Sequence, residues 1–335
     1  MNKTYLFITA LFVLIFMSCQ SRKKNNAEKQ NEIELVAEKQ LVFPLDEQTY
    51  YLSKSMFQFE ENGKEYLHFE NTQKSLYDIV IFDIENKQIA KRIPLHKTGP
   101  NGLPAVYGSR PSPDSKQILI SQNNIGRLST INNQGEVVHN YPVKTPEGRF
   151  TTFFFCSYYN APAFVKDSCI FLNQGIFKPN MKREDWPQTH MFASQNLETG
   201  KFEWVPIFYP PIFKEEYENI DGGYGFSYDY NYKESRLVCG FFGYDSLMVT
   251  DDLKHIRWYN AKSKYLKSMK PKLGNAMAGI NSIIEFCEAP MYWHIMYDKY
   301  RDVYYRFAEM PYKLAPNESP YDEPKGKEFS VIVLN

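Results

Sequence analysis

One short segment, repeated in outline along the chain, constrains the fold more than any other feature. Between Leu76 and Leu95 the sequence LYDIVIFDIENKQIAKRIPL has an apolar run, a polar turn at Glu85 to Gln88, and a second, more amphipathic stretch. A continuous apolar run predicts a buried strand, and an interrupted one predicts a strand with one exposed face. We therefore predict a β-hairpin here, in which a buried strand leads into an outer strand.

The same order of parts recurs along the chain, with turns that each close a buried strand and open an outer one. These turns lie at 84–88, 132–135, 196–200 and 251–254. About five units can be recognised, over 54–95, up to 143, 151–208, 224–259 and 292–334. Repeats of roughly 40–50 residues with four strands each are typical of β-propellers. We predict an all-β fold, a β-propeller of four-stranded blades; the alternative is an irregular β-sandwich.

The composition agrees with a β fold and argues against one class of partner. Aromatic residues make up 16% of the 335 residues, and Tyr and Phe favour pleated, half-buried surfaces. Twenty Pro and seventeen Gly, scattered along the chain, leave little room for long helices. Lys+Arg and Asp+Glu both number 39, so there is no basic excess and we expect no nucleic-acid partner.

The N-terminal segment has the plan of an export signal. Residues 1–18 combine a basic Lys3 with an apolar stretch that is short for a membrane span, and Cys19 follows. Phe16 to Cys19 resembles a lipobox, so we predict a lipoprotein signal peptide over 1–18 and lipid attachment at Cys19; an ordinary signal peptide is the alternative. Residues 20–32 have no apolar side chain except Ala27, so we expect 19–34 to form a flexible tether and 35–335 a single β-propeller domain.

Two features predict that the ring is incomplete. The chain stops at Phe329 to Asn335, a strand with no turn or outer partner after it, which would leave an exposed edge. Propellers often close by lending an N-terminal strand to the last blade, and Leu41 to Leu45 is placed to do so. We therefore expect an incomplete last blade, as in a C-terminally truncated copy of a longer protein that is roughly one blade of about 50 residues short.

Several segments resemble a known family. FPLDEQT (43–49), IPLHKTGPNGL (93–103) and IMYDKYRDVYYRF (295–307), together with the signal that ends at Cys19, are similar to a Bacteroidetes lipoprotein family known as domain of unknown function 4221. The resemblance covers most of the mature chain, and its GPNG turn and YDKYRDVYYRF hairpin are the most specific parts. It implies a propeller-like fold and an envelope location, and it carries no catalytic residues.

No pattern of residues indicates catalysis or a cofactor. The six His residues form no HExxH or similar metal-ligand pair, so we expect no metal site. The four Cys residues after Cys19 show no CxxC spacing. An exported chain can form disulfides, and Cys156 and Cys169 lie in consecutive predicted strands; buried free thiols, at these positions and at Cys239 and Cys287, are the alternative.

An aromatic, acidic segment is the candidate binding surface. Within Glu215 to Tyr232, several Tyr side chains interleave with carboxylates, and a second predicted insertion carries a Trp. If both insertions lie on one rim, their rings would form a mouth suited to a protein or glycan ligand. The candidate residues are Trp186, Tyr217, Tyr224 and Tyr228. The alternative is that these Tyr side chains lie in the cores between blades.

The sequence as a whole favours a membrane-anchored envelope lipoprotein that acts as a binding or interaction module through one propeller face. We expect it at the outer membrane, with the periplasmic side preferred because Arg22 to Lys24 follow the lipid-bearing Cys. Its partners would be the membrane, through the lipid, and a protein or glycan ligand. The alternatives are an enzyme acting on an extracellular glycan or peptide, and a non-functional truncated copy.

Overall fold

The computed structural model of the chain describes residues 42–49, 56–72, 77–112, 116–122, 126–143, 153–155, 161–175, 187–212, 225–266, 269, 280–320 and 326–335. The chain divides into two compact units, Met1–Val42 and Phe43–Asn335, and every described helix and strand belongs to the second. The predicted signal peptide, tether and Cys19 lie outside the described residues.

Five antiparallel sheets make up the second unit, and each is built from a contiguous segment of the chain. The first contains β1 (Phe57–Glu61), β2 (Lys64–Thr72), β3 (Tyr77–Asp83) and β4 (Gln88–Pro94). The second contains β5 (Gly108–Pro111), β6 (Ile118–Gln122), β7 (Arg127–Ile131) and β8 (Val137–Pro142). The third contains β9 (Phe153–Phe155), β10 (Phe164–Lys166), β11 (Cys169–Gly175), β12 (Phe192–Asn196) and β13 (Phe202–Trp204).

The fourth and fifth sheets complete the unit. The fourth contains β14 (Phe226–Asn231), β15 (Arg236–Phe241), β16 (Ser246–Thr250) and β17 (Arg257–Asn260). The short helix α3 (Ile280–Glu288) precedes the fifth sheet, which contains β18 (Met291–Asp298), β19 (Val303–Glu309) and β20 (Phe329–Leu334). The fifth sheet therefore has three strands in the described part of the chain, where the others have four or five. Whether a further strand belongs to it stays a prediction.

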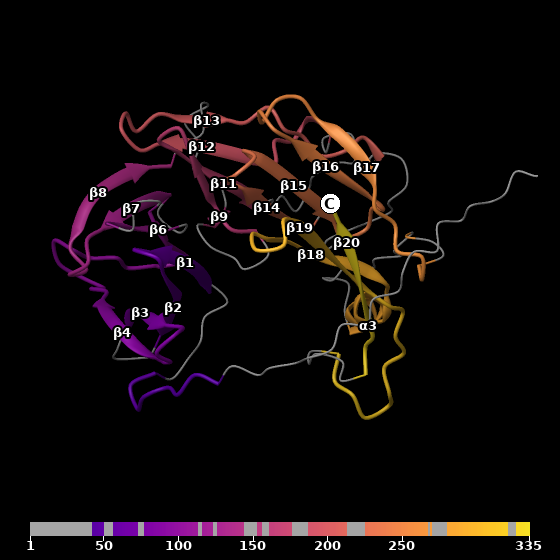
Figure 1. Cartoon of the computed structure of the whole chain (residues 1–335), viewed down its shortest axis with the longest axis horizontal. Helices are drawn as coiled ribbons and strands as arrows, with labels where there is room; N and C mark the ends of the chain where they lie inside the picture. Colours follow the sequence, from indigo (N-terminus) through magenta and orange to yellow (C-terminus); the bar gives the residue numbers. More distant parts are fainter. Residues whose placement is uncertain are drawn as a thin grey trace, which may run out of the picture. The chain divides into compact units, whose positions relative to one another are not determined.

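The sheets follow one another around a centre, as a β-propeller requires (Figure 1). The first strand of a sheet faces the middle of the ring, as β1, β14 and β18 show, and the last strand lies outside, as β4, β8, β13 and β17 show. The outer strands are correspondingly exposed; all four residues of β17 face solvent. The prediction of an all-β propeller with about five units is confirmed, and the β-sandwich is excluded.

Apolar side chains hold each sheet against the next. Ile79 and Ile93 of the first sheet pack with Ile118 and Ile131 of the second. The same arrangement joins the second to the third sheet, the third to the fourth, and the fourth to the fifth. In β3, Ile79 and Ile81 face the second sheet, while Val80 and Phe82 pack on the other side with Phe43. Because both faces are buried, β3 reads as the continuous apolar run IVIF rather than as an alternating pattern.

Most of the predicted hairpins are present, with the turn chemistry that their residues demand. Asn62 and Gly63 both have positive φ, 52° and 74°, as a tight turn between β1 and β2 requires. Three elements were not predicted: β5, β10 and α3. The strand predicted over 41–45 is absent from its described part, because residues 42–45 have no strand structure.

The GPNG turn is a joint between the first and second sheets. Gly99 has a φ of 88°, and its carbonyl oxygen accepts a hydrogen bond from the Gly102 N–H at 2.9 Å. The side chain of Asn101 accepts a hydrogen bond from the Val137 N–H on β8 at 3.1 Å. Next to it, Gly135 lies so close to Pro94 that an added Cβ would stand 2.0 Å from the Pro94 carbonyl oxygen. The turn therefore fixes how the two sheets meet.

The YDKYRDVYYRF segment forms the hairpin of β18 and β19 and anchors the fifth sheet on its neighbours. Arg306 is fully buried, and its guanidinium donates hydrogen bonds to the carbonyl oxygens of Asp245, Ala261 and Tyr244 at 2.5 to 2.8 Å. Tyr244 and Asp245 directly precede β16 of the fourth sheet, and Ala261 directly follows β17. At the hairpin turn, Lys299 forms ion pairs with Glu60 and Glu65 of the first sheet, at 3.1 and 3.2 Å.

Candidate functional site at the inner strands

The inner strands of the propeller bring charged and polar side chains together near the middle of the ring. Arg110 on β5 is 4% exposed, and its guanidinium lies over the ring of Phe57 on β1, 4.4 Å from the ring centre. Burial has the largest effect on the pKa values of His68 on β2 and Asp229 on β14, and the positive charge of Arg110 acts to lower both. These four residues, Phe57, His68, Arg110 and Asp229, come from three sheets and are called the Arg110 cluster below.

A buried serine links the cluster to a carboxyl group. His68 Nε2 lies 2.7 Å from Ser109 Oγ, and Ser109 also forms a hydrogen bond with Glu70. When Glu70 is ionised it must accept the single hydroxyl proton of Ser109, so His68 must donate through Nε2. Burial, opposed by the Ser109 hydrogen bond, raises the pKa of Glu70 to about 7. Burial and the nearby Arg110 charge lower the pKa of His68 to about 3, so this imidazole is neutral at physiological pH.

The serine, histidine and glutamate do not have the geometry of a hydrolase triad. In a triad the carboxylate holds the histidine, which in turn activates the serine. Here the carboxylate of Glu70 holds Ser109, and within the described residues His68 Nδ1 has no hydrogen-bond partner. Ser109 is also fully buried, so no substrate reaches its hydroxyl. The three residues form a buried polar link between the first and second sheets.

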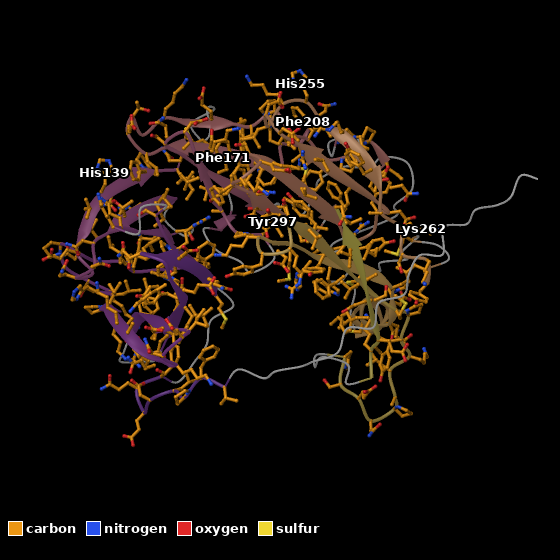
Figure 2. All side chains as sticks on the ribbon, in the orientation of Figure 1. His139, Phe171, Phe208, His255, Lys262 and Tyr297 are labelled. Atoms are coloured by element: carbon orange, nitrogen blue, oxygen red, sulfur yellow. The ribbon has the colours of Figure 1, made fainter. Side chains whose placement is uncertain are left out.

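On the other side of the cluster, two side chains of β14 take the place of a strand partner for β18. Ser227 Oγ donates to the Trp293 carbonyl oxygen at 2.7 Å and accepts from the Ile295 N–H at 2.9 Å. Asp229, two residues on and therefore on the same face, accepts from the Tyr297 N–H at 2.8 Å. Figure 2 labels Tyr297 on this inner strand. The register shift in β18 between Tyr292 and Ile295 lies beside these bonds.

Asp229 is tuned to titrate close to neutral pH. Burial raises its pKa to about 6, although hydrogen bonds from the backbone N–H groups of Tyr297 and Tyr230 and the charge of Arg110 all act to lower it. The site thus combines one permanent cation with two carboxyl groups, Asp229 and Glu70, that take up protons near neutrality. Such a site can hold an anionic group, and its charge depends on pH.

The structure describes one of the four predicted surface residues. Tyr228 is fully buried between the third and fourth sheets, and its hydroxyl donates to the Ala161 carbonyl oxygen at 3.1 Å. It is part of the core between blades, so the surface role predicted for it is wrong: side chains alternate along β14, and those of Phe226, Tyr228 and Tyr230 all enter this core. Trp186, Tyr217 and Tyr224 lie outside the described residues, and their role stays a prediction.

The cysteines behave partly as the alternative prediction states. Cys169, Cys239 and Cys287 are free thiols. Burial raises the pKa of the Cys239 thiol well above its usual value, which makes it unreactive. Cys156 lies outside the described residues.

The Arg110 cluster was not predicted from the sequence because β5 was not recognised. Its four residues, GSRP, have no apolar alternation and end in a proline. One signal was available: the other units begin with a strand ahead of their buried hairpin, and the second unit should have one between Leu95 and Gln117. A polar strand in that position would have placed Arg110 at the centre of the ring.

The described residues contain no group of three or more His, Cys, Asp or Glu side chains that could hold a metal ion. In the same ranges, no helix has the length and apolar character needed to cross a membrane.

Five antiparallel sheets around a polar centre define this protein as a five-bladed β-propeller. The sequence model of the domain of unknown function DUF4221 matches residues 32–335, and the chain belongs to that family. A crystal structure of a DUF4221 member from Bacteroides vulgatus is 83% identical, covers 92% of this chain and 85% of its own, and has a TM-score of 0.84. The family prediction is therefore confirmed.

More distant similarities add nothing beyond this. A putative exported protein from Bacteroides fragilis is 9% identical over 80% of this chain and 71% of its own, with a TM-score of 0.47. A hydrazine synthase from Kuenenia stuttgartiensis is also 9% identical, over 89% of this chain and 66% of its own, with a TM-score of 0.38. A search of curated proteins found no match.

Proposed function

We propose that this protein is a binding module of the bacterial envelope, which holds a ligand at the Arg110 cluster in the middle of its propeller. The observation that carries the proposal is that three sheets contribute buried polar and charged side chains to one place. Buried polar groups reduce stability unless they are paired, so their gathering there favours a role in binding. The middle of a propeller is also where ligands commonly bind.

The proposal includes attachment to the membrane through a lipid on Cys19. It is supported by the sequence of residues 1–19, which has a basic start, an apolar stretch and a lipobox-like end. The protein would then lie at the outer membrane, on the periplasmic side, close to soluble envelope ligands. Labelling cells with a fatty-acid analogue should mark the wild-type protein and leave Cys19→Ser unmarked. Equal labelling of both proteins would remove the anchoring part of the proposal.

The binding part is tested with the mature chain and sets of envelope glycan fragments and short peptides. We expect one of these sets to raise the melting temperature of the wild-type protein. Phe57→Ala should lose the ligand-induced rise, measured against its own ligand-free baseline. Phe329→Ala is the matched control, because this ring is exposed on β20, in a sheet that contributes no residue to the cluster. A ligand that stabilises both variants equally would contradict binding at the cluster.

An enzyme acting on a glycan or peptide is a second candidate. It is favoured by one observation: the pKa values of Glu70 and Asp229 are raised to about 7 and 6, which is the range of a general acid or base at neutral pH. Asp229 keeps partial exposure, whereas Glu70 is buried. If the candidate is right, the mature chain should release product from a bound glycan or peptide, and Asp229→Asn should still bind but not turn over.

A further inference from the structure

Two buried arginines in this protein differ in the hydrogen-bond acceptors around them. Arg306 donates hydrogen bonds to backbone carbonyl oxygens and lies against the ring of Tyr292 at 3.5 Å. Arg110 is almost as buried and also lies against an aromatic ring, that of Phe57. Within the described residues, however, its guanidinium makes no hydrogen bond or ion pair, and its buried Nε has no acceptor. Nε of Arg306 also lacks an acceptor, but its two Nη groups donate to carbonyl oxygens, whereas Arg110 has no acceptor for any of its donors among the described residues.

Asp229 and His68, whose pKa values the charge of Arg110 affects, form no hydrogen bond or ion pair with its guanidinium. Each oxygen of Asp229 already accepts a hydrogen bond from a backbone N–H, that of Tyr230 or that of Tyr297. His68 is uncharged at neutral pH and is held by Ser109. A guanidinium taken out of water without an acceptor destabilises the folded chain. The fold retains this cost at an inner strand of the propeller, so the unsatisfied donors indicate a missing partner.

The shape of the guanidinium limits what that partner is. One face of the planar group is covered by Phe57, so the donors that remain point outward along its edges. Two oxygen atoms held in one plane match such an edge and accept two parallel hydrogen bonds, which is the geometry of a carboxylate or a phosphate. The ring of Phe57, which is partly exposed, offers an apolar surface to the rest of the ligand.

We propose that Arg110 binds the carboxylate or phosphate group of a small ligand, with the ligand body against Phe57. This inference rests on the proposed binding function and adds the chemical class of the ligand and the group that recognises it. Carboxylates and phosphates share the required pair of oxygens, and the experiment below separates them. A protein surface as partner would instead require an extended contact that Arg110, with 4% exposure, does not offer.

The experiment observes Arg110 itself in the mature chain. The Nε–H resonance of Arg110, assigned by its loss in Arg110→Lys, is followed by NMR during titration with acetate, with inorganic phosphate, and with chloride at equal ionic strength. We expect acetate or phosphate to shift the resonance in a saturable way and chloride to leave it in place. The Nε–H of Arg301, which is exposed and paired with Asp298, is the internal control. The oxyanion that saturates at the lower concentration identifies the source as carboxylate or phosphate.

A stability measurement distinguishes a ligand-binding arginine from a structural one. Without added oxyanion, Arg110→Met should melt at or above the wild-type temperature, because it removes an unsatisfied charge. The oxyanion that shifts the resonance should raise the melting temperature of the wild type but not that of Arg110→Met. A lower melting temperature for ligand-free Arg110→Met, or no shift with either oxyanion, would overturn the inference. The proposed function would survive that result if a neutral glycan or peptide still bound through Phe57, and it fails separately if none binds.

Discussion

Replacing Arg306 tests whether backbone carbonyls recruited by one side chain hold the fifth sheet in place. In Arg306→Met the aliphatic bulk is largely kept, but three short hydrogen bonds, to Asp245, Ala261 and Tyr244, are lost. Each buried acceptor left without a partner costs about 1–3 kcal/mol. Removal of the buried charge itself returns part of that free energy. We therefore expect the free energy of unfolding to fall by about 3–5 kcal/mol, a large share of the total of a typical domain.

Urea unfolding followed by tryptophan fluorescence measures this change, since Trp293 lies on the adjoining strand β18. Arg306→Lys should fall between the variant and the wild type, because an ammonium group keeps the charge but cannot span the same carbonyls in one plane. Arg301→Met, on the same hairpin, is the control: Arg301 is exposed and should change stability by less than about 0.5 kcal/mol. If Arg306→Met unfolds within about 0.5 kcal/mol of the wild type, the carbonyls have other partners and the reasoning is refuted.

Three further predictions concern other parts of the molecule. Gly135→Ala should destabilise the protein by about 2–4 kcal/mol in urea unfolding, because the φ of 82° is strained for Ala and the new Cβ would meet the Pro94 carbonyl oxygen. Gly200→Ala, with a φ of 73° and open space around it, should cost only about 1 kcal/mol. Equal losses of stability in the two variants would contradict the steric argument. The pKa of Glu70 is about 7 in the fold against an ordinary value of 4.5, so the folded state binds the proton more tightly, and the contribution of this group to stability is complete at acid pH and is lost as pH rises to 7. The free energy of unfolding of Glu70→Gln should therefore match that of the wild type at pH 4 and exceed it by about 3 kcal/mol at pH 8. A difference that does not depend on pH would show that the carboxyl group does not titrate this way. Lys299→Met, which removes the exposed ion pairs to the first sheet, should cost less than about 1 kcal/mol and less still in high salt, as two melting curves would show.

The parts of the fold that could be predicted are those in which local pattern and final environment agree. The hairpin of β3 and β4 was predicted because β3 is a continuous apolar run, and the structure buries this run on both faces. The Asn62–Gly63 turn also agrees with its local sequence, because these residues tolerate positive φ. In contrast, β5 is stabilised by its pairing with β6, and the residues of β5 do not have the pattern of a strand.

The candidate site could not be predicted for a related reason. The cluster residues Arg110, His68 and Asp229 lie on different sheets and far apart in the sequence. Only the arrangement of the sheets around the centre brings them together. The tyrosines near β14 were visible in the sequence, but alternation along a strand decides whether each is buried, and a shift of one residue exchanges the faces. The burial of Tyr228 shows which face of β14 packs against the third sheet.

The construction of every sheet from one contiguous stretch of chain affects the order in which the protein can fold. Strand pairing needs only nearby hairpins, so the loops that must close are short and the entropic barrier to each sheet is small. As the chain leaves the ribosome, one sheet can assemble and then provide a packing surface for the sheet that emerges next. The ion pairs of Lys299 with the first sheet span most of the chain and can form only at the end of that sequence. The seam between the first and last blades should accordingly be the last contact made and the first lost when the protein unfolds.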